Sequence, residues 1–145
     1  MRNPHTVTAR LRDERGFTLL ELLVVMLVLG LLAAVGVPSF LLQKDKARDG
    51  EAKVAVRTAA MAIETYRTDN DGEYSDATEA HLRDIEPILN DADLAVISVA
   101  ANEYELQVVS ATGNTFRLAR LSNGTTNLAC DDPGRAGCPL SGTWG

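Results

Sequence analysis

One apolar segment near the N-terminus constrains the fold of this chain more than any other feature of its sequence. Residues 17–42 form a stretch of 26 residues that is interrupted only by Thr18, Glu21, Pro38 and Ser39. As a helix rising ~1.5 Å per residue, it would be about 39 Å long, whereas the hydrocarbon core of a bilayer is roughly 30 Å thick. The segment therefore predicts a membrane-spanning helix, followed by a more polar body.

Charge differs on the two sides of this segment. Residues 1–16 carry four arginines and two acids, whereas the rest of the chain has 10 basic and 18 acidic residues, a net charge of −8. Because positive charge is retained in the cytoplasm, this asymmetry predicts a cytoplasmic N-terminus and an exported body. A secretory signal peptide is the alternative, but its apolar core usually has about 7–15 residues. The acidic body, with a pI near 4.8, argues against direct contact with nucleic acid.

Glu21 is the one charged residue of the apolar segment. A carboxylate inside the membrane costs about 2.5–3.5 kcal/mol, and less near the interface. Two interpretations remain open from the residues alone. Either Glu21 lies at the membrane edge and reaches water, or a cation from another molecule pairs with it, since the segment itself contains none. The second interpretation would make Glu21 an assembly residue.

The residues around Glu21 carry a resemblance to a known family. They are Arg15-Gly16-Phe17-Thr18-Leu19-Leu20-Glu21. This run, continued by the apolar residues that follow it, resembles the N-terminus of type IV prepilins and of the related pseudopilins of type II secretion systems. The resemblance implies that residues 1–16 are a cytoplasmic leader, removed by cleavage between Gly16 and Phe17, and that Phe17 is then N-methylated. It also implies that Glu21 pairs with the N-terminal amine of a neighbouring subunit.

The same resemblance implies partners and a location. The partners would be other copies of this chain and related minor pilins in a helical filament, a prepilin peptidase that also methylates, and an assembly platform with an ATPase motor. Before assembly the protein would be a single-pass protein of the inner (cytoplasmic) membrane. After assembly it would lie in an extracellular surface pilus, with residues 17–42 as the fibre core.

Gly30 and Pro38 lie in the second half of the apolar segment. Proline removes a helical hydrogen bond and glycine lowers helix propensity by about 1 kcal/mol, so the predicted helix is weakest between them. In an isolated subunit this predicts a simple proline kink. In assembled pili of the resembled family this stretch is often extended, which implies that residues 30–38 lengthen on assembly.

Residues 43–67 change from apolar to amphipathic and predict that the helix continues beyond the membrane. One face carries Val56, Ala59, Ile63 and Tyr66 at helical spacing and should pack under a sheet. The mixed charges of residues 44–51 predict a solvated face, with salt bridges between subunits as the alternative. Residues 69–72 predict a turn that ends the helix. A calcium loop there is disfavoured, because Arg67 would take the first ligand position.

Residues 68–145 predict a β-rich head. Residues 78–89 suggest a connector with a helical turn or two, broken by Pro87, and residues 94–100, 103–109 and 115–121 predict strands. The residues expected on one buried face of the sheet are Tyr104, Leu106, Val108, Phe116, Leu118 and Leu121. The predicted fold class is α+β: a long N-terminal helix whose amphipathic half packs on an antiparallel sheet of about three to four strands, followed by a C-terminal disulfide loop.

Cys130 and Cys138 flank a polar, turn-rich segment near the C-terminus. In an exported domain they predict a disulfide, with a free thiol pair as the alternative. Two cysteines cannot by themselves make a four-ligand zinc site, and only His5 and His81 are available to join them, so no metal or cofactor is expected. Trp144, in the tail beyond the loop, is expected to pack over the sheet.

No constellation of residues predicts catalysis, and His81 stands alone as an exposed histidine, so the chain is not expected to be an enzyme. The favoured function is a structural subunit of a type IV pilus, polymerised for adhesion, twitching motility or DNA uptake. A type II secretion pseudopilin is the first alternative. The cysteine loop favours a pilin, whereas residues 66–74 resemble the linker of major pseudopilins. A monomeric, signal-anchored binding module is the alternative of another class.

Overall fold

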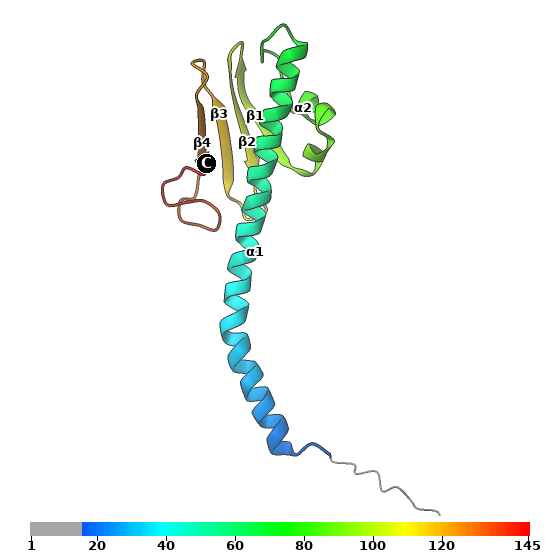
Figure 1. Ribbon diagram of the computed structural model, residues 1–145, viewed down its shortest axis with the longest axis vertical. Coiled ribbons are helices and arrows are strands. Elements are labelled where there is room, and N and C mark those ends of the chain that lie inside the picture. Colours follow the sequence, from blue (N-terminus) through cyan, green and yellow to red (C-terminus); the bar gives the residue numbers. More distant parts are fainter. Residues whose placement is uncertain (1–15) are drawn as a thin grey trace, which may run out of the picture. The chain divides into compact units, whose positions relative to one another are not determined.

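The computed structural model describes residues 16–145, so the predicted leader lies outside the described residues except for Gly16. The long helix α1 spans Leu19–Asp69, and Pro38 lies inside it. The chain divides into two units, with the first ending at Pro38 and the second comprising Ser39–Gly145, here called the head. Figure 1 shows the elements of the head, in which the sheet packs against the C-terminal part of α1.

The described part of the first unit is a short N-terminal segment and an apolar helix that buries nothing. From Gly16 to Pro38 every residue is exposed. The described residues contain one helix long and apolar enough to cross a membrane, judged by length and composition. An apolar helix of this kind is stable in lipid because its backbone polar groups are all bonded within it.

Four antiparallel strands form the sheet of the head, in the order β1-β2-β3-β4. Their bounds are Asp93–Ala100, Glu103–Val109, Thr115–Arg120 and Thr126–Cys130. Strand β2 matches its predicted range, and β1 and β3 each differ from theirs by one residue at one end. The antiparallel meander predicted from the sequence is therefore confirmed.

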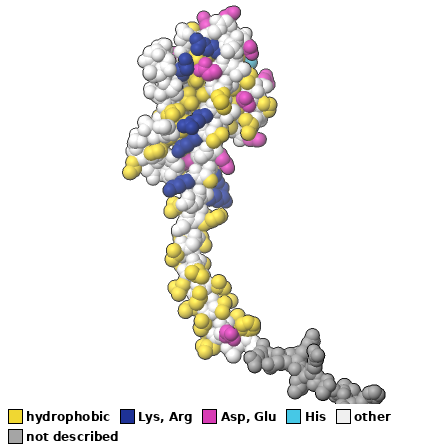
Figure 2. All heavy atoms as spheres, in the orientation of Figure 1, with side chains coloured by type: hydrophobic (Ala, Val, Ile, Leu, Met, Phe, Trp, Pro, Cys, Tyr) yellow, Lys and Arg dark blue, Asp and Glu magenta, His cyan; other side chains and the backbone are white. Residues whose placement is uncertain are grey.

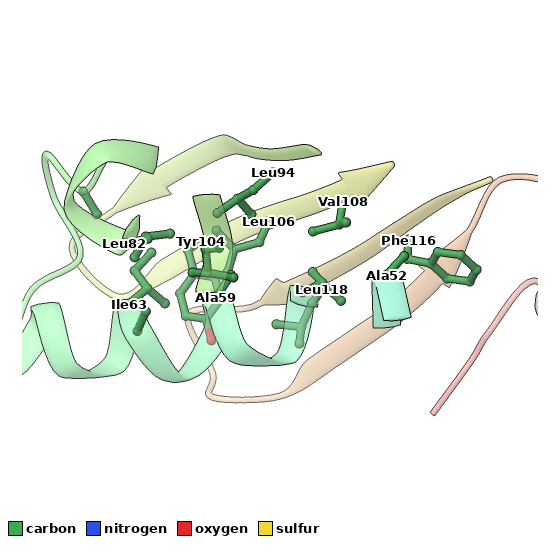
Figure 3. Packing of buried hydrophobic residues seen from close by; sticks show 14 of the residues in the cluster. Ala52, Ala59, Ile63, Leu82, Leu94, Tyr104, Leu106, Val108, Phe116 and Leu118 are labelled. Carbon is green, nitrogen blue, oxygen red and sulfur yellow. The ribbon is translucent and has the colours of Figure 1, made fainter. Parts of the chain in front are cut away.

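The core of the head lies between α1 and the sheet (Figure 3). The helix contributes the predicted face, since Val56, Ala59, Ile63 and Tyr66 are all buried. The sheet contributes alternate residues, as expected for a sheet with one buried face. These are Leu94, Tyr104, Leu106, Val108, Phe116 and Leu118. Trp144 is also buried, and its ring meets Phe116 edge to face at 5.9 Å, which confirms that the tail packs over the sheet.

A turn and a connector link α1 to the sheet. Asp71 and Gly72 have positive φ values of 52° and 81°, a conformation that ends the helix and that glycine adopts without strain. Helix α2 spans Glu79–Ile85 and is capped by Thr78, whose side chain accepts a hydrogen bond from the backbone N–H of His81. A 3-10 helix, η1, follows at Pro87–Asp91. The predicted connector and its interruption at Pro87 are confirmed.

Two sequence predictions about the head are wrong in detail. Leu121 does not continue the buried face, because β3 ends at Arg120 and Leu121 is 38% exposed in the turn that follows. The charged run 44–51 is not solvated throughout, because Asp49 is fully buried. Asp49 lies three and seven positions before the core residues Ala52 and Val56, so it shares their face of the helix.

Candidate functional site

The first candidate site is the start of the mature helix predicted from the sequence. Gly16, Phe17 and Thr18 precede α1 in non-helical conformation, and all three are exposed. Phe17 is 82% exposed, and no atom lies within 4 Å of a Cβ built at Gly16. The peptide bond between Gly16 and Phe17 is therefore not covered by any described residue of the chain.

Thr18 caps the helix, a role that was not predicted from the sequence. Its Oγ1 accepts a hydrogen bond from the backbone N–H of Glu21 at 3.1 Å, and its carbonyl accepts one from Leu22 at 3.2 Å. Thr18 and Glu21 are three residues apart, the spacing of a capping box. The signal was present in the sequence as Thr-x-x-Glu at the start of an apolar run.

Glu21 lies in the first turn of α1 with its side chain exposed. Among residues 16–145, no hydrogen bond or ion pair reaches its carboxylate. Its position near the positive end of the helix dipole is favourable for a negative charge, although this effect is worth only about 0.3–1 kcal/mol at exposed sites. The single chain thus holds the backbone of Glu21 through Thr18 and leaves the carboxylate available to another molecule.

Gly30 and Pro38 both lie within continuous α-helix in this single chain. No atom lies within 4 Å of a Cβ built at Gly30, so packing inside the chain does not explain the glycine. The lengthening of residues 30–38 on assembly stays a prediction.

The second candidate site is the C-terminal loop, here residues 131–145. The disulfide Cys130–Cys138 is formed, and the backbone N–H of Cys130 donates to the carbonyl of Gly142 at 2.8 Å. The indole Nε1 of Trp144 donates to the carbonyls of Arg117 and Ala129, at 3.2 and 2.8 Å. These contacts attach the loop to the last two strands of the sheet.

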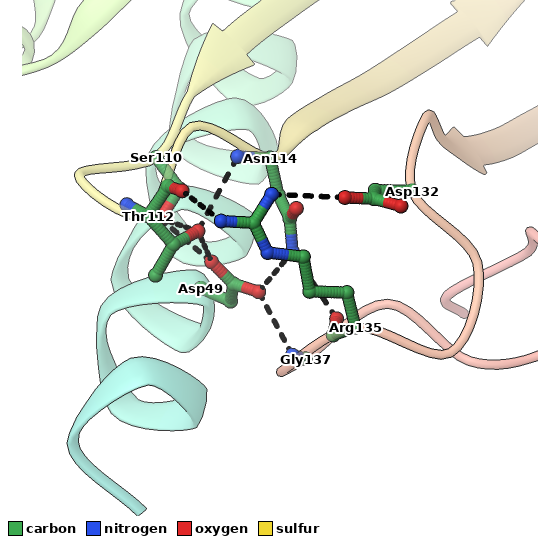
Figure 4. Close-up of polar contacts among 7 residues, drawn as sticks. All are labelled: Asp49, Ser110, Thr112, Asn114, Asp132, Arg135 and Gly137. Atoms are coloured by element: carbon green, nitrogen blue, oxygen red, sulfur yellow. Dashed lines mark hydrogen bonds and ion pairs between the residues drawn. The ribbon is translucent and has the colours of Figure 1, made fainter. Parts of the chain in front are cut away.

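Asp49 attaches the same loop to α1 (Figure 4). Its carboxylate accepts four hydrogen bonds, from Ser110 Oγ at 2.7 Å, Thr112 Oγ1 at 2.5 Å, Asn114 Nδ2 at 2.6 Å and the backbone N–H of Gly137 at 2.8 Å. One buried side chain thereby joins the helix, the β2–β3 turn and the disulfide loop. This role of Asp49 was not predicted from the sequence, although its spacing from Ala52 and Val56 could have indicated it.

The hydrogen bonds also set the charge state of Asp49. Burial acts to raise the pKa of its carboxyl, but the hydrogen bonds from Thr112, Ser110, Gly137 and Asn114 together outweigh burial and hold the pKa below its ordinary value. The residue is therefore ionised at neutral pH. Its charge is stabilised by neutral donors instead of by a salt bridge.

His81 and the turn at residues 69–72 make contacts that stabilise the fold. The His81 ring is stacked on Tyr66 with centroids 5.1 Å apart, and its Nδ1 is 3.1 Å from Thr78 Oγ1. Arg67 Nε donates to the carbonyl of Gly72 at 2.5 Å, so the arginine stabilises the turn. Across the described 16–145 range, no group of three or more His, Cys, Asp or Glu side chains is placed to hold a metal ion.

Removing the disulfide should destabilise the head. Replacing both cysteines, Cys130→Ser with Cys138→Ser, is expected to lower the free energy of unfolding by about 2–3 kcal/mol, because the short loop is no longer closed in the unfolded chain. Denaturant unfolding of the fragment 43–145, followed by the fluorescence of Trp144, measures this loss. An unchanged midpoint would show that the non-covalent contacts of the loop are sufficient to hold it.

Comparison with known proteins agrees with this geometry. Residues 11–37 match the family model described as the prokaryotic N-terminal methylation motif. The chain is 41% identical over 59 residues to type II secretion system core protein G of Pseudomonas aeruginosa, covering 41% of this chain and 42% of that protein. It is 39% identical over 61 residues to the protein of the same name from Vibrio cholerae, covering 42% of each. It is 36% identical over 63 residues to type IV major pilin protein PilA of Myxococcus xanthus, covering 43% of this chain and 28% of that protein.

The matched region spans less than half the length of these relatives. The matched motif lies at the start of the exposed apolar helix, and a small α+β head follows that helix. The N-terminal region of this chain is therefore similar to that of pilins and pseudopilins.

Proposed function

We propose that this protein is a structural subunit, not an enzyme, that is cleaved between Gly16 and Phe17 and polymerises through its apolar helix into a filament. The observation that carries the proposal is the exposure of the apolar segment. From Phe17 to Leu42 no side chain is buried, and the large apolar side chains are 46–83% exposed. In Figure 2 hydrophobic side chains cover this part of α1.

An exposed apolar surface of this size must be covered by lipid or by protein. Before assembly, the bilayer covers it and the protein is a single-pass membrane protein with a cytoplasmic N-terminus. After assembly, the same helices cover one another in the core of a filament. The prepilin peptidase, an assembly platform and an ATPase motor are the partners that this sequence of events requires.

Glu21 fixes the axial position of each subunit relative to its neighbour in the proposed filament. Cleavage creates a positively charged amine at Phe17, and the carboxylate of Glu21 has no partner among the described residues of its own chain. A carboxylate inside an apolar core is costly unless it is paired. Each subunit therefore places its N-terminal amine against Glu21 of a neighbour, and only one axial position satisfies both charges.

The relatives favour a type II secretion pseudopilus as the filament. Two of those described above are named as core proteins of that system, and the third is named as a major pilin. The disulfide loop favours a second candidate, a surface pilus, because major pseudopilins usually lack such a loop. Deleting the gene separates the two. Loss of exoprotein secretion with surface pili intact supports the pseudopilus, and loss of surface pili with secretion intact supports the pilus.

The intact mass of the assembled protein tests the proposal directly. Filaments sheared from cells are expected to contain a chain that begins at N-methylated Phe17 and lacks two hydrogens for the disulfide. A full-length chain found only in membranes would contradict the proposal and would support a monomeric, membrane-anchored module.

Gly16→Ala should abolish the mature form. The expected reason is that the prepilin peptidase does not cleave the variant, because its substrates in this family carry glycine before the cleaved bond. The chain itself has open space for the added methyl group at Gly16, and Gly36 has the same open surroundings. Gly36→Ala is therefore the matched control. Immunoblots should show only precursor for the first variant and normal processing for the second, and equal processing of both would show that Gly16 is not recognised.

A further inference from the structure

Charge is segregated on the head. Residues 71–93, which form α2, η1 and their flanks, contain eight acidic residues and one basic residue, Arg83, and none of the eight acids is buried. We call these residues the acidic flank. A second surface, here called the basic face, is formed by Lys53 and Arg57 of α1 together with Arg135 of the C-terminal loop, which is paired with Asp132 at 3.0 Å. Figure 2 shows Lys and Arg side chains following α1 along the head, and Asp and Glu on the side where Figure 1 places α2.

The basic face is built by α1 together with the C-terminal loop. Lys53 Nζ donates to the carbonyl of Gly137 at 2.6 Å, and the guanidinium of Arg57 lies 5.2 Å from the centre of the Trp144 ring. These contacts hold the two cations against the loop. Leu140 in the same loop is 87% exposed, so an apolar side chain projects beside the charges.

The acidic flank has its own apolar feature. A groove of about 590 Å³ lies between α1 and η1. Its lining includes Val54, Ala55, Ile88 and Leu89, and its charged lining residues are Arg48, Glu51, Asp91 and Asp93. Ile88 is 70% exposed and Val54 64% exposed. Each of the two charged surfaces therefore carries exposed apolar side chains, and burying them would stabilise a contact with another molecule.

The two surfaces lie at opposite edges of the sheet. Helix α2 of the acidic flank contacts β1, and the C-terminal loop of the basic face is bonded to β4. These are the two end strands in the order β1-β2-β3-β4. In a pair of heads related by a two-fold axis, both copies use the same surface for the contact. Because the acidic flank and the basic face lie at opposite edges of the sheet, the other surface of each head would stay uncovered. A head-to-tail contact, repeated from copy to copy, covers both and produces an open helical array when it does not close.

We propose that the acidic flank of one subunit docks on the basic face of the next copy of this chain. The contact rests on the proposed function, because it supplies the head-to-head interface of the filament while the apolar helices supply its core. Charge complementarity indicates that the partner is a second copy of this chain, because the cations that would pair with the acidic flank are present on the basic face of the same molecule. Opposite potentials across the contact fix its register and exclude mismatched packing.

Zero-length crosslinking tests this contact because lysine is rare in the chain. The only lysines are Lys44, Lys46 and Lys53, all on α1. Sheared filaments of the full mature chain are treated with a carbodiimide, which joins lysine amines to carboxylates in direct contact. The expected result is a ladder of covalent oligomers, with peptides that join Lys53 to a carboxylate within residues 71–93 of a different subunit.

Lys53→Arg is the matched control, because it keeps the positive charge and removes the reactive amine. Its filaments should form in normal amounts, and the ladder should fall by about tenfold or more. Links that run only through Lys44 or Lys46, links to acids outside residues 71–93, or filaments without a ladder would overturn the contact while leaving the proposed function intact. If the wild-type chain forms no filament, both the proposed function and this contact are wrong.

Discussion

Glu21→Gln is expected to abolish filament assembly while leaving the precursor in the membrane and the head folded. The substitution keeps the size of the side chain and removes its charge, so the N-terminal amine of the neighbouring subunit is left unpaired in an apolar core. Removing one partner of a buried charge pair costs about 2–5 kcal/mol. The yield of sheared filaments should therefore fall by about 30-fold or more, as measured by quantitative immunoblot against the membrane fraction.

Two controls separate assembly from folding and processing. Glu103→Gln makes the same chemical change at an exposed position of the head, outside the acidic flank and the basic face, and should leave the yield unchanged. The Glu21→Gln protein should retain cleavage after Gly16 and the Cys130–Cys138 disulfide, both visible in its intact mass. Wild-type filament yield from Glu21→Gln would show that Glu21 serves only as a polar residue at the membrane edge.

The start of the helix could be predicted because its chemistry is local. Glycine, an aromatic residue, an acid and an unbroken apolar run occur at fixed spacing, so roles in processing and assembly could be predicted for Gly16, Phe17 and Glu21 without any tertiary information, and these roles stay predictions. The cap formed by Thr18 is equally local and was missed. The partner of Glu21 could not be assigned from the residues, because it belongs to another molecule.

Most of the head was also predictable, because its helix and central strands bury one face each. Strand β2 alternates buried and partly buried residues along its length, so its bounds were predicted correctly. Strand β4 was not identified, because only Leu128 and Cys130 among its residues are buried or partly buried apolar side chains. An edge strand with so few core contacts carries almost no periodic signal.

Asp49 shows where prediction from composition fails. A charged residue within a charged run is normally solvated, and the donors that make its burial favourable lie more than 60 residues away along the chain. Its spacing placed it on the core face, but only the folded head brings Ser110, Asn114 and Gly137 to it. A buried charge of this kind depends on tertiary contacts that no local pattern encodes.

Asp49→Ala is expected to destabilise the head by about 3 kcal/mol or more. The substitution leaves the backbone N–H of Gly137 without an acceptor and removes one of the two acceptors of the Asn114 amide, whose other acceptor is the carbonyl of Arg135. Each unsatisfied buried donor costs about 1–3 kcal/mol. The C-terminal loop should also be held less firmly against α1, since only the contacts of Lys53 with Gly137 and of Arg57 with Trp144 would still join them. Denaturant unfolding of the fragment 43–145 measures the loss, with Trp144 fluorescence reporting the loop. If the wild-type fragment 43–145 did not fold, this would contradict the packing of α1 on the sheet.

The pH dependence of the stability of the head distinguishes the contribution of the charge of Asp49 from that of its volume. Because the folded-state pKa lies below the ordinary value of 3.8, the stabilisation is fully present above that value and is lost as the pH falls toward the lower folded-state pKa. Wild type should therefore lose stability below about pH 4. Asp49→Asn, which keeps the shape and lacks the charge, should be less stable at pH 7 and should lose less on acidification. Equal acid sensitivity of the two proteins would show that other carboxylates, such as Glu79 with its hydrogen bond from Val96, control the acid unfolding of the head.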